Sequence, residues 1–105
     1  MGFTGNEDHS ITLEDAAKLT ANYRKNSGEN VIKGGFFGKT ALKNIIGQEG
    51  CIGIRFYYGQ ESDGKPCLVL VGADAGENDM TGGLLAERQL PCPPYCDENS
   101  VLNKD

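Results

Sequence analysis

Two strand-like segments joined by a short turn constrain the fold of this chain more than any other feature. Residues 52–58 alternate strictly, so that two isoleucines, a phenylalanine and a tyrosine share one face. Residues 62–65, with the sequence Ser-Asp-Gly-Lys, are a hairpin turn signal. Residues 67–71 are apolar on both faces, which is typical of a central strand. Together they predict an antiparallel hairpin whose second strand lies inside a sheet.

Two helices are expected before this hairpin. Thr12 is a good N-cap with Asp15 at the third helical position, and residues 26–28, Asn-Ser-Gly, supply the end of the helix. A second, shorter helix is expected over residues 40–46, ended by Gly47. Residues 31–38 contain three glycines and predict a short strand or an extended loop.

A third strand over residues 84–90 completes the expected sheet. The sum is an α+β fold: an antiparallel meander of three to four strands packed against two helices. We expect residues 1–10 to be a disordered lead-in and residues 11–96 to form a single domain with a Cys/Pro-rich closing segment. Residues 97–105 are expected to be a flexible tail.

The composition excludes some partners and favours others. The chain has 15 acidic and 10 basic residues, whereas binding of nucleic acid needs a basic face. No apolar run approaches the roughly 20 residues that span a bilayer, and the first ten residues lack the features of a secretion signal. We therefore expect a cytoplasmic protein that binds neither nucleic acid nor membrane. With 38% apolar residues and no Trp, its core is modest, so a protein partner or a second copy would stabilise it.

No arrangement of residues indicates an enzyme, and we assign no catalytic residue. Residues 38–40, Gly-Lys-Thr, look like the end of a phosphate-binding loop, but Lys33 stands where that loop needs its first glycine. His9 is the single histidine and lies in the expected disordered lead-in, so we assemble no Ser-His-Asp or Cys-His-Asn arrangement around it. The acidic residues at 74–79 lack the spacing of a calcium loop.

Cys92 and Cys96 bracket a Pro-Pro-Tyr sequence near the end of the chain. The segment invites comparison with the CPYC motif of glutaredoxins, but three residues separate the thiols instead of two and no helix-forming segment follows. Dithiol exchange is therefore disfavoured.

Strand register predicts which cysteines lie together. Cys67 pairs near Tyr58 across the hairpin, and Cys51 is seven residues further along, or roughly 23 Å away at ~3.3 Å per residue. If residues 84–90 pair with the central strand, Cys67 lies opposite Leu90, and Cys92 and Cys96 emerge beside it. This predicts a cluster of Cys67, Cys92 and Cys96 that excludes Cys51. Free thiols, a disulfide within the cluster and a zinc site remain alternatives, although no fourth zinc ligand is evident.

A recognition surface is the other candidate site. Arg55 and Tyr57 share one strand face, and Phe36, Phe37 and Tyr95 are further aromatic residues that such a surface can include. Packing of these aromatic residues against neighbouring strands is the alternative. A groove between Phe36-Phe37 and the sheet is a third type of site, for which the sequence identifies no ligand.

Four segments of the sequence, taken together, resemble a single protein family. These are ITLEDAAKLTANYRK, GGFFGKTALKNIIGQEGCIGIRFYYG, DGKPCLVLVGAD and LLAERQLPCPPYC, which span residues 11–96. They are similar to a family of small bacterial proteins, of the kind found in Bacteroidetes, that end in a PCPPxC tail and have no assigned activity. The resemblance implies a bacterial protein and assigns a role to no residue.

Two functional hypotheses follow. The first is a small non-enzymatic interaction module that binds a protein partner or itself, because no catalytic arrangement is present and the core is small. The second is a thiol-dependent or zinc-dependent protein that uses the cluster of Cys67, Cys92 and Cys96. Apart from that zinc ion, we expect no cofactor.

Overall fold

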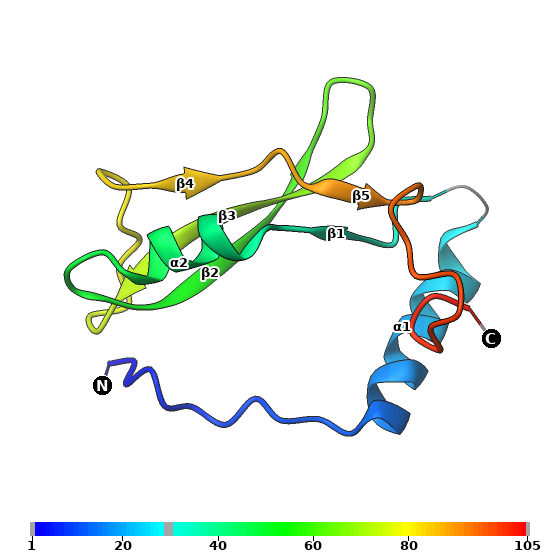
Figure 1. The fold of residues 1–105 in the computed structure, drawn as a ribbon, viewed down its shortest axis with the longest axis horizontal. Coiled ribbons are helices and arrows are strands. Elements are labelled where there is room, and N and C mark those ends of the chain that lie inside the picture. The colour runs from blue at the N-terminus through cyan, green and yellow to red at the C-terminus, as the bar shows by residue number, and fades with distance from the viewer. Residues whose placement is uncertain (1, 29–30, 105) are drawn as a thin grey trace. The chain divides into compact units, whose positions relative to one another are not determined.

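The computed structural model describes residues 2–28 and 31–104. These residues belong to two compact units, each formed from two segments of the chain. The first, which we call the sheet unit, comprises Met1–Asp8 and Phe37–Gln89. The second, the helix unit, comprises His9–Phe36 and Leu90–Asp105. Figure 1 colours the chain by residue number, so the two segments of each unit can be traced.

The sheet unit is built on the predicted hairpin. β2 (Cys51–Gln60) and β3 (Pro66–Asp74) pair antiparallel, with Gly59 opposite Cys67 and a register shift between Cys51 and Gly53. In the turn, Glu61 N donates to Lys65 O at 2.8 Å. Gly64 has a φ of 91°, which favours glycine. The predicted turn and the predicted strand over residues 52–58 are both confirmed.

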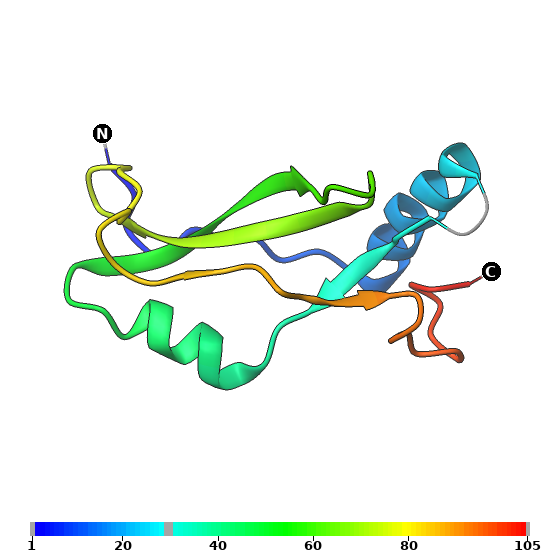
Figure 2. The same cartoon turned by 90° about the horizontal axis from the view of Figure 1, so that it is seen from above.

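β3 is the central strand, as predicted, because β4 (Leu85–Ala86) pairs with its other edge. The helix α2 (Lys39–Ile46) contacts both β2 and β3, and Figure 2 shows it along one side of the hairpin. Gly47 ends this helix by donating its N–H to Lys43 O at 2.8 Å. The buried apolar residues of the described chain all belong to this unit; they are Ile45, Cys67, Leu70, Val71 and Ala73.

The helix unit contains α1 (Leu13–Ser27). Thr12 is its N-cap, and the Thr12 hydroxyl oxygen accepts a hydrogen bond from Asp15 N at 3.1 Å. Gly28, with a φ of 83°, follows its last residue. Both predicted ends of the helix are thus confirmed. None of its fifteen residues is buried within the described structure.

A second sheet of two strands also belongs to the helix unit. β1 (Gly34–Phe36) pairs antiparallel with β5 (Leu90–Cys92), so that Phe36 lies opposite Leu90. The prediction of one strand over residues 84–90 is therefore wrong beyond Ala86, because Leu90 pairs with β1 instead of β3. Charged residues follow Ala86, and Pro91 has no N–H to donate, so this segment is poorly suited to extend a central ladder.

The α+β fold class is confirmed. The structure has two helices and a three-stranded antiparallel meander in the order β2-β3-β4, together with the two-stranded sheet of β1 and β5. The predicted division into residues 1–10, 11–96 and 97–105 stays a prediction. In the structure, residues at both ends of the chain make hydrogen bonds within their units, such as Phe3 N to Ala75 O at 3.0 Å.

Candidate functional sites

Glu61, Cys67 and Glu87 form the first candidate site. Glu61 directly follows β2, Cys67 is the second residue of β3, and Glu87 directly follows β4. One ligand atom from each residue lies within 4.8 Å of the others. Cys67 is only 8% exposed and makes no disulfide, whereas Glu61 is exposed and Glu87 is half-buried. Three segments of the sheet unit thus bring two carboxylates to a buried thiol.

Strand register explains this convergence. Glu61 is two residues beyond Gly59, the cross-strand partner of Cys67, and therefore shares its face of the sheet. Extending the pairing of Leu70 with Ala86 places Glu87 on the same face. A Cβ added at Gly59 would lie 2.9 Å from the Cys67 sulfur, so this glycine leaves the room that the thiol occupies.

The three groups perturb one another. The negative charge of Glu87 raises the pKa of Glu61. Burial raises the pKa of the Cys67 thiol, and the charges of Glu61 and Glu87 raise it further. Because the thiolate is the nucleophilic form, this environment makes Cys67 a poor nucleophile. The two carboxylates give this part of the sheet unit a negative charge when they are ionised.

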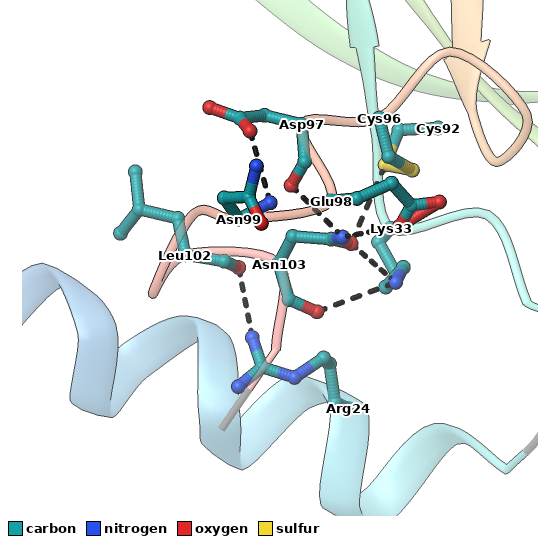
Figure 3. Close-up of a disulfide and its surroundings, with 9 residues drawn as sticks. All are labelled: Arg24, Lys33, Cys92, Cys96, Asp97, Glu98, Asn99, Leu102 and Asn103. Carbon is teal, nitrogen blue, oxygen red and sulfur yellow. Dashed lines mark hydrogen bonds between the residues drawn. A yellow bond between two sulfur atoms is a disulfide. The ribbon is translucent and has the colours of Figure 1, made fainter.

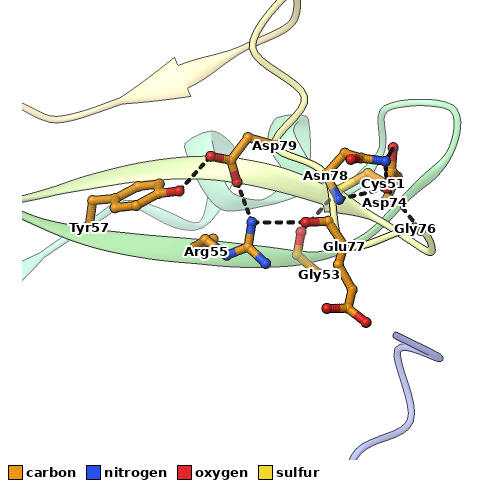
Figure 4. A network of polar contacts seen from close by, with 9 residues as sticks. All are labelled: Cys51, Gly53, Arg55, Tyr57, Asp74, Gly76, Glu77, Asn78 and Asp79. Atoms are coloured by element: carbon orange, nitrogen blue, oxygen red, sulfur yellow. Dashed lines mark hydrogen bonds and ion pairs between the residues drawn. The ribbon is translucent and has the colours of Figure 1, made fainter. Parts of the chain in front are cut away.

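Arg55, Tyr57 and Asp79 form a second polar group in the sheet unit, drawn in Figure 4. Arg55 Nη1 lies 2.5 Å from Asp79 Oδ1, and the Tyr57 hydroxyl donates to Asp79 Oδ2 at 2.6 Å. Hydrogen bonds from Tyr57 and Arg55 lower the pKa of Asp79, and the same carboxylate raises the pKa of Tyr57 and of Arg55. The Arg55 guanidinium also lies 5.4 Å from the centre of the Phe3 ring.

Cys92 and Cys96 form a disulfide in the helix unit, shown with its surroundings in Figure 3. Tyr95, inside the five-residue loop that the disulfide closes, donates its N–H at 2.8 Å to the carbonyl of Pro91, the residue before that loop. The C-terminal residues contact this region and α1: Lys33 Nζ donates to the Asn103 side chain, and Arg24 Nη1 donates to Leu102 O at 2.8 Å. The disulfide therefore belongs to a polar cluster that ties β1, β5 and the C-terminal segment together.

The predicted thiol group is divided between the two units. Cys92 and Cys96 are bonded to each other, which is one of the pairings that the prediction left open. Cys67 is free, and its neighbours are carboxylates. The premise that Cys67 lies opposite Leu90 is wrong, because β4 ends at Ala86. Cys51 is also free and pairs with Asp74 at the far end of the hairpin, as its register predicts.

The predicted recognition residues fall into two groups. Arg55 and Tyr57 are brought together by Asp79 in the sheet unit, to which Phe37 also belongs. Phe36 and Tyr95 are in the helix unit and are 59% and 60% exposed. A recognition role for all five stays a prediction.

Sequence reasoning missed Glu61 and Glu87, and it considered Asp79 only as part of a possible calcium loop and not as a partner of Arg55 and Tyr57. The hairpin register alone places Glu61 on the face of Cys67, so that signal was present in the sequence. Glu87 and Asp79 lie in or near irregular segments after β3, where no alternation pattern gives a register.

Comparison with known proteins gives no match: no family model, no curated protein and no solved structure is similar to this chain. The resemblance to bacterial proteins with a PCPPxC tail is untested by these comparisons. Among the described residues, no helix has both the length and the apolar character that crossing a bilayer requires.

Proposed function

We propose that this chain is a small, non-enzymatic interaction module that binds a second copy of itself along the free edge of β2. The supporting observation is that this ten-residue strand has only one neighbour in its sheet, the strand β3. An open strand edge presents a row of backbone donors and acceptors, which makes it a template for pairing with another chain.

The direction of the hydrogen bonds identifies the open groups. Gly72 O accepts from Met80 N at 2.8 Å, so even-numbered residues of β3 direct their backbone groups away from β2. The odd-numbered residues of β3 direct their backbone groups towards β2, where they lie opposite the odd-numbered residues of that strand. Ile54, Phe56 and Tyr58 therefore direct their N–H and C=O groups outward, where no described residue of the sheet unit bonds them.

The side chains of β2 suit self-association. Phe56 is 53% and Tyr58 is 94% exposed. Natural edge strands are often protected by lysines, prolines or inward-pointing charges. β2 has no proline, and its single charged residue is Arg55, which is already paired with Asp79. Its register shift lies at the Cys51 end, away from these aromatic residues.

Two β2 strands that pair antiparallel about a two-fold axis would give each of these backbone groups a hydrogen-bond partner. With the axis at Phe56, Ile54 of one copy lies opposite Tyr58 of the other, and the outward-facing backbone groups of these three residues pair. Arg55 then lies opposite Tyr57 of the second copy, so no like charges face each other. Such an interface is closed, which limits assembly to a dimer.

Sedimentation velocity over a range of concentrations tests this proposal. The wild-type chain is expected to shift from monomer to dimer, whereas Tyr58→Lys is expected to remain monomeric at concentrations where the wild type is dimeric. Tyr95→Lys is the matched control, because Tyr95 is also exposed but lies outside β2. A wild-type chain that stays monomeric, or a dimer that both variants weaken equally, would contradict the proposal.

The proposal retains the bacterial origin and cytoplasmic location expected from the sequence. In a reducing compartment Cys92 and Cys96 would be thiols, since cytoplasmic disulfides are rare. Thiol trapping in intact bacterial cells tests this location. Four reactive cysteines in the denatured chain would support a cytoplasmic location, whereas two would contradict it.

A further inference from the structure

We propose that Glu61, Cys67 and Glu87 form a binding site for one zinc ion. The site is independent of the β2 edge, and no part of the proposed dimer is needed to complete it. Its starting point is that one thiol and two carboxylates, contributed by three separate segments, converge to within 4.8 Å.

The separation of the ligand atoms suits zinc after a small adjustment. Zn–S bonds of about 2.3 Å and Zn–O bonds of about 2.1 Å place tetrahedral ligands roughly 3.6 Å apart. The observed upper limit of 4.8 Å exceeds this by little more than 1 Å. Glu61 is exposed and can change its rotamer, while Cys67 is fixed in β3 and buried. The rigid thiol would anchor the ion and the carboxylates would close on it.

The charges of the site favour a cation. Neither Glu61 nor Glu87 makes an ion pair within residues 2–28 and 31–104; the nearby Lys65 is paired with Asp63 at 3.9 Å. Two carboxylates beside a buried thiol repel one another when ionised. A divalent cation removes this repulsion and deprotonates the thiol that it binds.

The segment after Glu87 also carries a buried polar atom without a hydrogen-bond partner among the described residues. Gln89 Oε1 is inaccessible to solvent and has no hydrogen-bond partner among the described residues. Its Nε2 donates to the carbonyl of Pro66, the residue before Cys67, at 3.5 Å. Buried polar atoms are nearly always hydrogen-bonded. Three protein ligands leave a fourth position on zinc for a water molecule.

The donor set selects the type of metal. Calcium and magnesium prefer oxygen ligands alone, so a thiolate at the most buried position disfavours them. Zinc is borderline soft and accepts sulfur and carboxylate ligands together. Gly59 supports this arrangement because a larger residue would occupy the space around the Cys67 sulfur.

The test is zinc titration by calorimetry and cobalt substitution, on the full chain kept reduced. The wild type is expected to bind one zinc ion, and its cobalt form is expected to show a thiolate-to-cobalt absorption band. Cys67→Ala should abolish the band, and Glu61→Gln and Glu87→Gln should each weaken zinc binding by about 10-fold or more. Both glutamine variants preserve side-chain shape at sites that are not fully buried, so they are expected to fold.

Three controls distinguish this site from others. Cys51→Ser should retain both the band and the affinity, because Cys51 lies at the far end of the hairpin. The double variant Cys92→Ser/Cys96→Ser should also retain them, which separates this site from the reduced tail thiols. Tyr58→Lys should bind zinc normally even as a monomer. No zinc binding, or binding that follows Cys92 and Cys96 instead of Cys67, would overturn the proposal.

Discussion

The sheet unit and the helix unit are stabilised by different interactions. The sheet unit contains all the buried apolar residues of the described chain, and Leu70 at its centre is fully inaccessible to solvent. The helix unit has no buried residue within its described part; it is held by the ends of α1, a short two-stranded sheet, a disulfide and polar contacts of the C-terminal segment. Burial of apolar surface is the dominant favourable term in folding, so the two units should respond differently to substitution.

The largest effect is expected from the core of the sheet unit. Leu70→Ala should lower the free energy of unfolding by about 2–5 kcal/mol, because it removes buried methyl groups and leaves a cavity. Leu19→Ala, at a position of α1 that is 61% exposed, should change it by no more than ~0.5 kcal/mol. Urea denaturation of both variants measures the difference. Equal losses would mean that Leu19 is buried in solution.

The disulfide should give the next largest effect, confined to the helix unit. The chain-entropy model assigns about 2 kcal/mol to closing so short a loop, so Cys92→Ser/Cys96→Ser should destabilise this unit by about that amount. Hydrogen exchange resolves the two units separately. The amides of Lys33 and Tyr95 should lose protection, while those of β3 should not. Cys51→Ser is the control. Equal loss of protection in β3 would show that the units unfold together.

The N-cap of α1 should contribute less. Thr12→Ala removes the acceptor for Asp15 N and should cost about 1 kcal/mol of helix stability, measured by hydrogen exchange of residues 15–20. Thr40→Ala in α2 is the matched control, because the N-cap of that helix is Gly38 and makes no side-chain hydrogen bond. Similar losses in the two helices would contradict the view that α1 depends more strongly on its local cap.

The smallest effect is expected from the partly exposed group around Asp79, and it should depend on pH. The folded pKa of Asp79 is lowered, so its contribution is complete above the unfolded value of about 3.9 and is lost as the pH falls through the folded pKa. The pKa of Tyr57 is raised, so its contribution is present below the unfolded value of about 10 and is lost as the pH rises through the folded pKa.

Asp79→Asn tests this dependence through urea denaturation across a pH series. The stability difference from the wild type should be level between about pH 5 and pH 9 and should narrow on both sides of that range. Tyr57→Phe should remove the change in stability at alkaline pH and reduce the change at acid pH, because the Tyr57 hydroxyl also lowers the pKa of Asp79. A difference that is constant from acid to alkaline pH would rule out an electrostatic origin.

Much of the fold could be predicted because its signals are local. The N-cap of α1 depends on residues three apart, and the β2–β3 register follows from the turn that joins the strands. The pairing of β1 with β5 gave no such signal, since strands of three residues are too short for alternation to fix a partner. The same limit explains why Leu90 was assigned to the wrong sheet.

The sequence by itself determined the positions of both helices, the central hairpin and the separation of Cys51 from Cys67, because short-range hydrogen bonds and side-chain alternation specify them. Only the tertiary structure decided which groups surround each remaining cysteine. The disulfide joins Cys92 to Cys96, and Cys67 lies with Glu61 and Glu87, which are 26 residues apart in the chain. The proximity of these three residues depends on where β4 ends along β3. The end of a two-residue strand is set by packing and by competition between strand pairings, which no local sequence pattern encodes.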